Sequence, residues 1–497
     1  MKKSMMKVGL FKLGGFLLVS ALMFTSCQKG FDADETFSST VRDSQLASPS
    51  LTKDNFSVRV NADGSESILV SWDAVPGAGG YSYRVDNMDS GEPVLIEEGQ
   101  TDKSLFLFPK ADDTKYQVTG KTLGNDKLGN KEAESATVFA YSTMIEAQMI
   151  PAGEDIVAFV KANIKDTEDE QAFELAGDSY TISEELDFGN HKVTFRGNKI
   201  NWPIITMETD GVIRTSAGLK VKWMKFDCTK QGSKGVFECS SNPPSSLESS
   251  NFAGFPDAVY YLKDPIIFQD CWFKNVPRCL FFSGECSWGI EDMRIVNCIV
   301  QLNNDGTSFG DAAVIGTYSS TSKYKDGQSW YGAVRNITVK ESTIYNIQDN
   351  FKNRMIRFIN KSFNKTFDTP KGSATFTNNT IVKVMSDKEF ANNTPNESTY
   401  SISFNGNVLY IVARLAKFIQ GKCTIDCDLT KNTSYTLPTK TGDGARFAGD
   451  YNYCTEEDPG FNEADLKELD LTKENGGVNF KAKGTISSTI GDPRWLK

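Results

Sequence analysis

The sequence has few of the residues from which metal centres and nucleic-acid interfaces are built. His191 is the only histidine among 497 residues, and the ten cysteines include no CxxC pair. Structural zinc sites cluster these two residue types, so we expect no metal site. The formal net charge is −10, and removing the four lysines of residues 1–26 leaves about −14 on the rest of the chain. A general nucleic-acid binder needs a basic surface instead, so we expect no nucleic-acid partner.

Long apolar segments are also scarce. The one clear run, residues 16–24, follows Lys2, Lys3, Lys7 and Lys12 and is too short for a stable membrane anchor. It predicts a signal peptide over residues 1–26. The run ends in Phe24-Thr25-Ser26-Cys27, which resembles a lipobox, the motif whose cysteine becomes acylated. We therefore expect a lipid anchor at Cys27, with an ordinary signal peptide and an incidental cysteine as the alternative.

The segment that follows Cys27 is polar. Residues 28–49 are rich in Ser, Asp and Thr, which predicts a flexible tether over residues 27–50. Its acids Asp32, Asp34 and Glu35 resemble the surface-export signal of Bacteroidetes lipoproteins. This resemblance implies a protein that is lipid-anchored in the cell outer membrane and exposed at the surface.

Nine cysteines remain once Cys27 is set aside. Cys228, Cys271 and Cys298 fall on apolar-patterned segments, where a thiol packs as a small hydrophobic group. A disulfide within Cys271, Cys279 and Cys286 stays open at this point.

Residues 51–143 predict a first domain of short strands separated by turns. Residues 67–72 alternate apolar and polar, a Pro/Gly turn follows, and residues 81–85 alternate again. The stretch SWDAVPGAGGYSYRV at 71–85 and the later TKYQVTG at 114–120 resemble a fibronectin type III domain. The resemblance implies a β-sandwich with Trp72, Tyr81 and Tyr116 in its core.

The pattern changes after Pro151. Apolar residues at Ile156, Phe159, Val160 and Ile164 predict an amphipathic helix over residues 155–164. Short apolar segments separated by turn residues then predict strands at 172–175, 180–182, 186–188 and 193–195. This order resembles the entry to a right-handed parallel β-helix, with a capping helix before the first coil.

An internal repeat is the strongest signal in the chain. The template apolar-x-apolar-x-x-(small or polar)-x-apolar recurs with its small or polar residue at Cys271, Cys298, Ser342, Asn379 and Asn407. These positions are separated by 27, 44, 37 and 28 residues, whereas one coil of a β-helix takes roughly 20–30 residues. We expect the longer gaps to carry loops and the five residues to stack as a ladder at a bend. A weaker match, through Val221, Trp223, Phe226 and Cys228, places Phe226 at the same bend.

The C-terminal end carries further family evidence. Asp458-Pro459-Gly460-Phe461 and the later Ile490-Gly491-Asp492-Pro493-Arg494-Trp495 resemble the closing segment of Bacteroidetes β-helix lipoproteins. These are families of uncharacterised function from polysaccharide-utilisation systems, with pectate lyases among their relatives. The resemblance implies an all-β chain with a right-handed parallel β-helix over residues 150–497. It also implies outer-membrane glycan-import proteins as partners.

Three long inserts interrupt the predicted coils, at residues 242–257, 303–333 and 386–399. Loops that leave one face of a solenoid form the walls of a ligand groove. The second insert is rich in aromatic residues, and its Tyr324, Trp330 and Tyr331 are candidates to stack on sugar rings. The alternative is that they pin the insert to the coils.

A pectate-lyase-like enzyme needs an arginine or lysine base and usually carboxylates that hold Ca²⁺. The sequence offers several residues of both types but no ordered Asp cluster. The candidate bases are Lys274, Arg278, Arg335, Arg354, Arg357 and Lys361. The candidate carboxylates are Asp227, Asp270, Glu285, Glu291, Asp305 and Asp311.

Residues 352–365 form a basic segment without an intervening acid, in which Arg354, Arg357 and Lys361 are candidate ligand-binding residues. Arg354 and Arg357 are three positions apart, so on a regular strand they face opposite sides. A local basic strip attracts polyanions in spite of the negative net charge, because screening limits that repulsion to about 8–10 Å. The alternative is an ordinary solvated coil edge.

The leading hypothesis is a surface lipoprotein that binds an acidic, uronic-acid polysaccharide without catalysis. One alternative is a polysaccharide lyase, for which Ca²⁺ becomes a possible cofactor. The other is a structural or adhesive surface protein.

Overall fold

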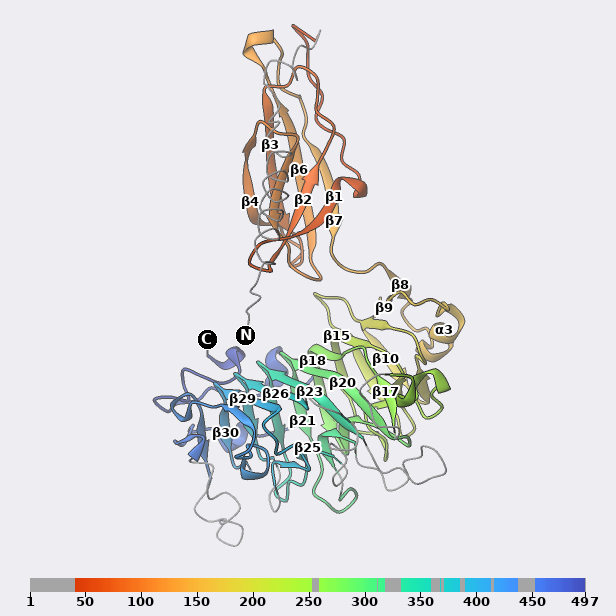
Figure 1. Ribbon diagram of the computed structural model, residues 1–497, viewed down its shortest axis with the longest axis vertical. Helices are drawn as coiled ribbons and strands as arrows, with labels where there is room; N and C mark the ends of the chain where they lie inside the picture. Colours follow the sequence, from red (N-terminus) through yellow and green to blue (C-terminus); the bar gives the residue numbers. More distant parts are fainter. Residues whose placement is uncertain are drawn as a thin grey trace, which may run out of the picture. The chain divides into compact units, whose positions relative to one another are not determined.

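The structure is a computed structural model that describes residues 41–252, 259–310, 312–317, 332–358, 367, 371–384, 389–412, 415–436 and 452–496. The chain divides into two compact units, Met1–Ile145 and Glu146–Lys497 (Figure 1). Cys27 and the predicted signal peptide lie outside the described residues. In the described part of the chain, no helix has the length and apolar character needed to cross a membrane.

The first unit is a fibronectin type III-like β-sandwich of two antiparallel sheets. One sheet contains β1 (Phe56–Val60), β2 (Glu66–Ser71) and β5 (Leu105–Pro109). The other contains β4 (Val94–Thr101), β3 (Gly80–Asn87), β6 (Lys115–Leu123) and β7 (Thr137–Ser142). Trp72, Tyr81 and Tyr116 are buried between the sheets, as the sequence predicts. The Trp72 and Tyr81 rings meet edge to face at 5.1 Å, and the Ala111 backbone N–H donates to the Tyr116 hydroxyl.

The expected tether ends earlier than residue 50. Leu46 is buried in the sandwich core, and the backbone N–H of Asp43 donates to Leu128 O at 3.0 Å. The Ser44 N–H donates to the side chain of Asn130. The prediction of a tether through residue 50 is therefore wrong for its last part, because an apolar residue within the polar stretch packs into the first unit.

The second unit is a right-handed parallel β-helix whose coils each pass through three faces, which we call sheets A, B and C (Figure 1). Sheets A and B are joined in one 19-stranded sheet that β8 (Ala147–Ile150) and β17 (Tyr260–Leu262) extend. The strands of sheet A are β9 (Gln171–Leu175), β12 (Val193–Arg196), β15 (Leu219–Asp227), β18 (Ile266–Val276), β20 (Trp288–Val296), β23 (Ala333–Lys340), β26 (Gly372–Thr377), β29 (Tyr400–Asn405) and β31 (Thr424–Asp426).

Sheet B contains the second halves of β15 and β18, which continue through the bend. Its other strands are β10 (Ser179–Ile182), β13 (Ile204–Met207), β21 (Ile299–Leu302), β24 (Thr343–Asn346), β27 (Thr380–Val382), β30 (Val408–Tyr410), β32 (Thr433–Tyr435) and β33 (Thr455–Glu456). Sheet C is the separate seven-stranded sheet. Its strands are β11 (Glu185–Asp187), β14 (Val212–Thr215), β16 (Phe237–Cys239), β19 (Cys279–Phe282), β22 (Ala313–Gly316), β25 (Arg354–Arg357) and β28 (Ala391–Asn392).

The bend between sheets A and B carries the predicted ladder. Asn379, Asn407 and Asn432 are fully buried there. The Asn407 backbone N–H and side-chain amide both donate to Oδ1 of Asn432, at 3.0 and 3.1 Å. Asn379 makes the same pair of bonds to Asn407, at 3.1 and 2.9 Å. Ser342 and Cys298 continue the ladder, because the Cys298 N–H donates to the Ser342 hydroxyl at 3.1 Å.

A backbone turn of one residue makes each bend. Asp270, Asn297, Glu341 and Asn378 all have φ between 51° and 56°, and each directly precedes a ladder residue. Gly406 takes this place before Asn407 with φ 77°. A Cβ on Gly406 would lie 2.1 Å from Oδ1 of Asn378, so the close approach of the neighbouring coil requires glycine.

The placement of Phe226 at the ladder position is wrong. Met224 is the residue that pairs with Cys271, while Trp223 occupies the preceding turn with φ 56°. The repeat in this coil therefore starts at Leu219, which pairs with Ile266. Phe226 instead pairs with Phe273 and lies in the core.

The N-terminal end of the β-helix is closed by α3 (Ile156–Asn163), as the sequence predicts (Figure 1). Ile156 and Val160 pack in the core of the large unit. The Asp155 carboxylate caps the helix by accepting from the Ala158 N–H at 3.0 Å. The cysteines predicted to be core residues, Cys228, Cys271 and Cys298, are buried, and no disulfide joins cysteines in the described part of the chain.

The C-terminal segment with the predicted closing motifs covers the outward side of sheet B. Leu469, Phe480 and Trp495 form an apolar cluster with outward residues of that sheet, including Trp272 and Tyr345. The indole N–H of Trp495 donates to the Thr343 hydroxyl at 2.7 Å. Much of this face is therefore occupied by the chain itself.

The inward register is tested by Phe268→Asp and Ile295→Asp. Both residues are fully buried, and they pair with each other across adjacent coils. A carboxylate at either place lacks a partner, so each variant should lose more than about 4 kcal/mol of the unfolding free energy of the large unit. Calorimetry measures this loss, with the outward Thr375→Asp as the control. Unchanged melting of both variants would contradict the register.

Candidate functional site

The candidate site is the outward face of sheet C. Paired residues of neighbouring parallel strands point to the same side, so one outward residue per coil forms a continuous row. We call this the outer row. Its members are Asp187, Arg214, Glu238, Phe282, Gly316, Arg357 and Asn392.

The strands of sheet C have two consecutive inward residues between two outward ones. In β25 both Met355 and Ile356 belong to the core cluster, whereas Arg354 and Arg357 do not. Arg354 pairs with Ala313 and Arg357 with Gly316, which share the outward side with Phe282. The expectation that the two arginines face opposite sides is therefore wrong, because the strand does not alternate regularly.

The three predicted inserts all adjoin sheet C. Residues 242–257 follow β16, residues 303–333 contain β22, and residues 386–399 contain β28. Tyr324, Trp330, Tyr331 and Lys361 lie outside the described residues. The three inserts thus adjoin one face of the solenoid, and a groove on that face and the candidate aromatic residues stay predictions.

An aromatic and cationic cluster occupies the middle of this face. The Arg278 guanidinium lies over the Phe282 ring at 4.2 Å and within 5.9 Å of the Phe309 ring. Its Nη1 donates to Ser233 O at 2.7 Å. Stacked guanidinium groups keep in-plane N–H donors available for an acceptor such as a carboxylate.

Arg354 and Arg357 differ in exposure. Arg354 is 3% exposed. Arg357 is half-buried, and its Nη1 donates to Gly310 O. Arg357 is therefore the better placed of the two to meet a ligand, whereas Arg354 supports the strand.

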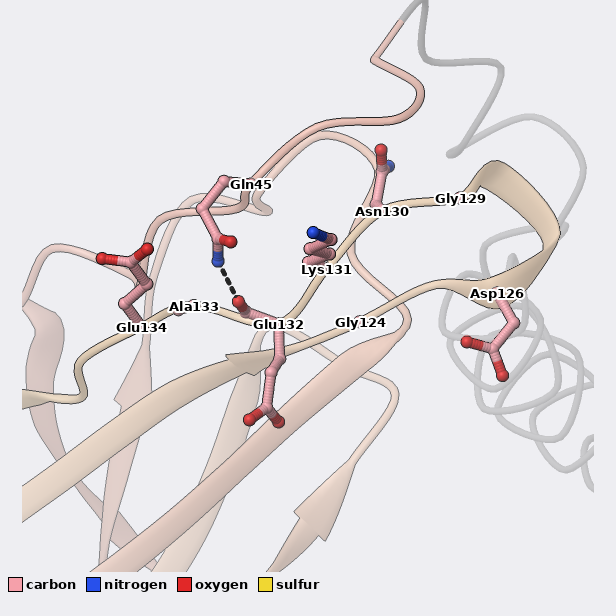
Figure 2. A pocket seen from close by; sticks show the side chains of 9 residues that line it. All are labelled: Gln45, Gly124, Asp126, Gly129, Asn130, Lys131, Glu132, Ala133 and Glu134. Atoms are coloured by element: carbon pink, nitrogen blue, oxygen red, sulfur yellow. Dashed lines mark hydrogen bonds between the residues drawn. The ribbon is translucent and has the colours of Figure 1, made fainter.

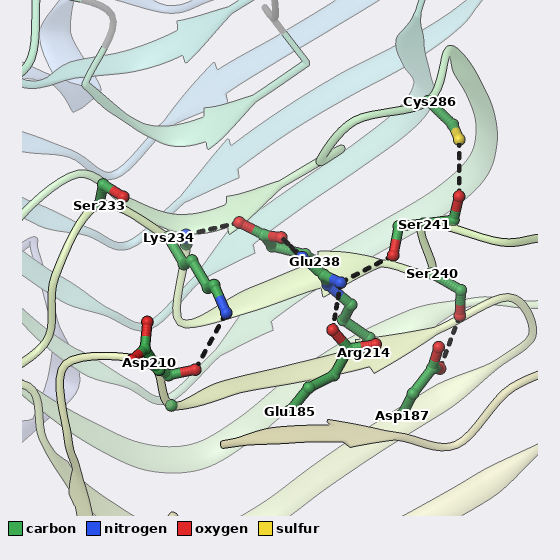
Figure 3. Close-up of polar contacts among 12 residues, drawn as sticks. Glu185, Asp187, Asp210, Arg214, Ser233, Lys234, Glu238, Ser240, Ser241 and Cys286 are labelled. Carbon is green, nitrogen blue, oxygen red and sulfur yellow. Dashed lines mark hydrogen bonds and ion pairs between the residues drawn. The ribbon is translucent and has the colours of Figure 1, made fainter. Parts of the chain in front are cut away.

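The other end of the outer row is an ion-pair network (Figure 3). Arg214 Nη2 lies 2.9 Å from Glu238 Oε2, and Arg214 Nη1 contacts Glu185 and the Ser241 hydroxyl. Arg214 and Glu238 are 6% and 3% exposed. Glu238 also accepts from the Gly235 N–H at 2.8 Å. Nearly all the hydrogen-bonding capacity of this pair is therefore used within the fold.

The electrostatics of the network argue against a role for Arg214 as a proton acceptor. Burial alone opposes its charge, but Glu238 and Glu185 outweigh burial and raise the pKa of Arg214 above its ordinary value. The guanidinium therefore stays protonated. Burial also raises the pKa of Glu185, against the opposing effect of Arg214.

The remaining candidate bases and acids lie in separate pairs rather than in one cluster. Lys274 bridges Asp227 and Glu468 beside the C-terminal segment, at 3.8 and 3.2 Å. Arg335 pairs with Glu291 at 3.2 Å, in sheet A. Asp270 accepts from the Asn297 side chain at the A–B bend. Within the described ranges, no three His, Cys, Asp or Glu side chains group as metal ligands.

The sandwich has a shallow depression of about 750 Å³ (Figure 2). Gln45, Lys131 and Glu134 are among its lining residues, and the Gln45 amide donates to Glu132 O. Its walls come from loops and both signs of charge are present. It offers no aromatic ring, and its buried Asn130 amide donates to Val41 O and Gly77 O within the fold, so we do not assign it a ligand.

Two family models match parts of the sequence, and both describe domains of unknown function. DUF4992 matches residues 6–189, and DUF4957 matches residues 178–347. No curated protein sequence matches the chain.

Solved structures similar to each unit are known. The fn3 domain of the human collagen alpha-1(XX) chain has 16% identity, covers 21% of this chain and 89% of its own, and has a TM-score of 0.16. Pectate lyase Pel3 from Pectobacterium carotovorum has 14% identity, and the match covers 80% of this chain and 87% of the lyase, with a TM-score of 0.20. Pectate lyase PelI from Erwinia chrysanthemi, solved with tetragalacturonic acid, has 8% identity. The match covers 75% of this chain and 87% of the lyase, with a TM-score of 0.14. These values support no inference about ligand or activity.

The Arg214–Glu238 pair should be essential for stability. Arg214→Met leaves the buried Glu238 carboxylate without its partner, which costs about 3–5 kcal/mol of unfolding free energy. The matched control is Arg294→Met, since Arg294 pairs with Asp292 on sheet A and its side chain is 49% exposed. The control should change stability by less than about 1 kcal/mol. Equal melting temperatures for the two variants would contradict the assignment.

Proposed function

We propose that this chain binds an acidic polysaccharide on the outward face of sheet C, as a lipid-anchored protein of the cell surface. The observation that carries the proposal is that Arg278, Arg354 and Arg357 lie on the same side of that sheet as the Phe282 ring, over which Arg278 stacks. Guanidinium groups bind carboxylates through paired N–H donors, and aromatic rings pack against sugar C–H groups.

A comparison of the three faces supports this choice. The C-terminal segment covers much of sheet B. On sheet A, outward cations pair with nearby acids, such as Arg196 with Glu174 at 2.7 Å and Lys220 with Glu170 at 2.7 Å. Sheet C combines cations, an aromatic ring and the adjoining inserts.

The negative net charge is compatible with an acidic ligand. Repulsion from distant carboxylates fades beyond about 8–10 Å at physiological ionic strength. The electrostatic energy of a ligand bound on the outer row therefore depends mainly on the charges of that row. Binding should therefore depend on local arginines and weaken as salt rises.

Arg357→Gln should weaken retention of polygalacturonate in affinity gels. Loss of a charge-assisted hydrogen bond costs about 1.5–3 kcal/mol, which is a factor of about ten or more in affinity. Arg294→Gln removes the same charge from sheet A and should leave retention unchanged. Arg354→Gln should mainly lower the melting temperature, because Arg354 is buried. If retention changes neither in the Arg357→Gln variant nor with rising salt, the result would point to a neutral glycan.

The same preparations test catalysis. A lyase acting on a uronic-acid polymer produces unsaturated ends that absorb in the ultraviolet, and Ca²⁺ is added to support such a reaction. We expect retention without growth of this absorbance. Steady growth that Arg357→Gln abolishes would replace the binding proposal with a lyase, and no retention at all would favour a structural or adhesive role.

The membrane anchor is tested by Cys27→Ala. Removing the thiol removes the acylation site, so the protein should move from the membrane fraction to the soluble fraction. Cys228→Ala is the control, because Cys228 is buried in the core. An unchanged distribution of the Cys27→Ala variant would exclude this cysteine as the anchor.

A further inference from the structure

The second coil turns from sheet A to sheet B by a different route from the later coils. Residues 197–203 separate β12 from β13, where later coils use a single residue. Backbone bonds fix this turn to the next coil, since Gly197 N–H donates to Lys222 O and Lys225 N–H donates to Pro203 O. The Asn198 carboxamide accepts from two further N–H groups of the turn. The turn is therefore preorganised.

The turn carries Trp202 onto the outward side of sheet B. Its ring meets Trp272 edge to face at 5.8 Å, and its indole N–H donates to Lys199 O at 3.1 Å. Trp202 is half-buried, and Ile200 beside it is 57% exposed. An aromatic ring and an apolar side chain are thus held on a fixed turn.

Lys225 lies at the same place and lacks an acid. Its Nζ is 4.8 Å from the centre of the Trp272 ring and donates to Leu471 O at 2.8 Å. No carboxylate of the described chain lies within ion-pair distance of this Nζ. Burial lowers the pKa of Lys225 below its ordinary value. Its outward neighbour Lys274, by contrast, contacts Asp227 and Glu468.

Two properties of this site select the ligand. A partly desolvated ammonium without an acid gains most from a bound anion. The adjacent indole offers a flat apolar surface of the kind that packs on the C–H face of a sugar. Lys199 adds a second cation, with its Nζ 5.3 Å from the Trp223 ring.

We propose that Lys225, Trp202 and Trp272 form a second glycan subsite, which binds one anionic sugar. Its carboxylate or sulfate group meets the Lys225 ammonium, and its ring packs against Trp202. This subsite lies at the border between the turn 197–203 and the C-terminal segment, and it requires no residue of sheet C. It therefore goes beyond the proposed function and can be tested apart from it.

The test is titration of the full chain with digalacturonate, a sulfated chondroitin disaccharide and the neutral cellobiose. Tryptophan fluorescence and calorimetry report binding. We expect a fluorescence change with one or both anionic sugars and none with cellobiose. The preferred anionic sugar identifies carboxylate or sulfate as the recognised group. Trp202→Phe should remove most of this change, since the reporting ring is Trp202.

Lys225→Met keeps the aliphatic stem against Trp272 but removes the charge. It should weaken binding at least ten-fold, and Lys225→Arg should restore most of it. Lys230→Met is the control, because Lys230 is exposed and pairs with Glu208. A lower melting temperature for Lys225→Met with unchanged binding would overturn the proposal and leave Lys225 as a structural tie to Leu471.

The same titration in Arg357→Gln separates the two sites. The Trp202 signal should persist in that variant, with the remaining affinity unchanged. If retention of polygalacturonate depends on Arg357 but no anionic sugar changes the Trp202 signal, the subsite proposal fails and the function stands. If the Trp202 signal persists in Arg357→Gln and retention of polygalacturonate is also unchanged in that variant, the subsite stands and the assignment to sheet C fails.

Discussion

The later coils of the large unit turn between sheets A and B at a single residue, and the buried residue after each turn has a backbone N–H that needs an acceptor. The side chain of the next coil supplies it. The Asn432 side chain accepts from the Asn407 N–H, and the Asn407 side chain accepts from the Asn379 N–H. In the same way, the Ser342 hydroxyl accepts from the Cys298 N–H. An unsatisfied buried N–H costs about 1–3 kcal/mol, so a slip of one coil against the next is penalised at every turn. This ladder fixes the register on which the apolar stacks and the outer row both depend.

Once the register is fixed, the three faces acquire different roles. Sheet B packs its outward apolar residues against the C-terminal segment, through Leu469, Phe480 and Trp495. Sheet A matches outward cations with acids. Sheet C keeps arginines and a phenylalanine ring in line, because one residue of each coil contributes to the same row.

Cations of this chain fall into two groups with different physical consequences. Arg214 is buried between Glu185 and Glu238, and its charge is neutralised within the fold. Lys225 instead bonds a backbone carbonyl, Leu471 O, and pairs with no acid of the described chain. A carbonyl oxygen satisfies a donor without cancelling its charge, so such groups favour an anionic ligand. The anion binding that we propose at Lys225 is therefore compatible with a chain of net charge −10.

The sequence by itself determined the parts of the fold that depend on local pattern. The alternation around Trp72 and Tyr81, the amphipathic helix at 155–164 and the repeat through Asn407 each bury apolar residues at a fixed period, and that period is legible in the chain. The out-in-in-out pattern of sheet C was present too, as in Arg354-Met355-Ile356-Arg357, but a period-two template misses it. Only the tertiary structure decided that Arg354 is buried while Arg357 is half-buried, that no acid of the described chain pairs with Lys225, and that Lys274 pairs with two. These properties depend on which side chains from distant coils and from the C-terminal segment come together, and sequence spacing carries no information on those distances.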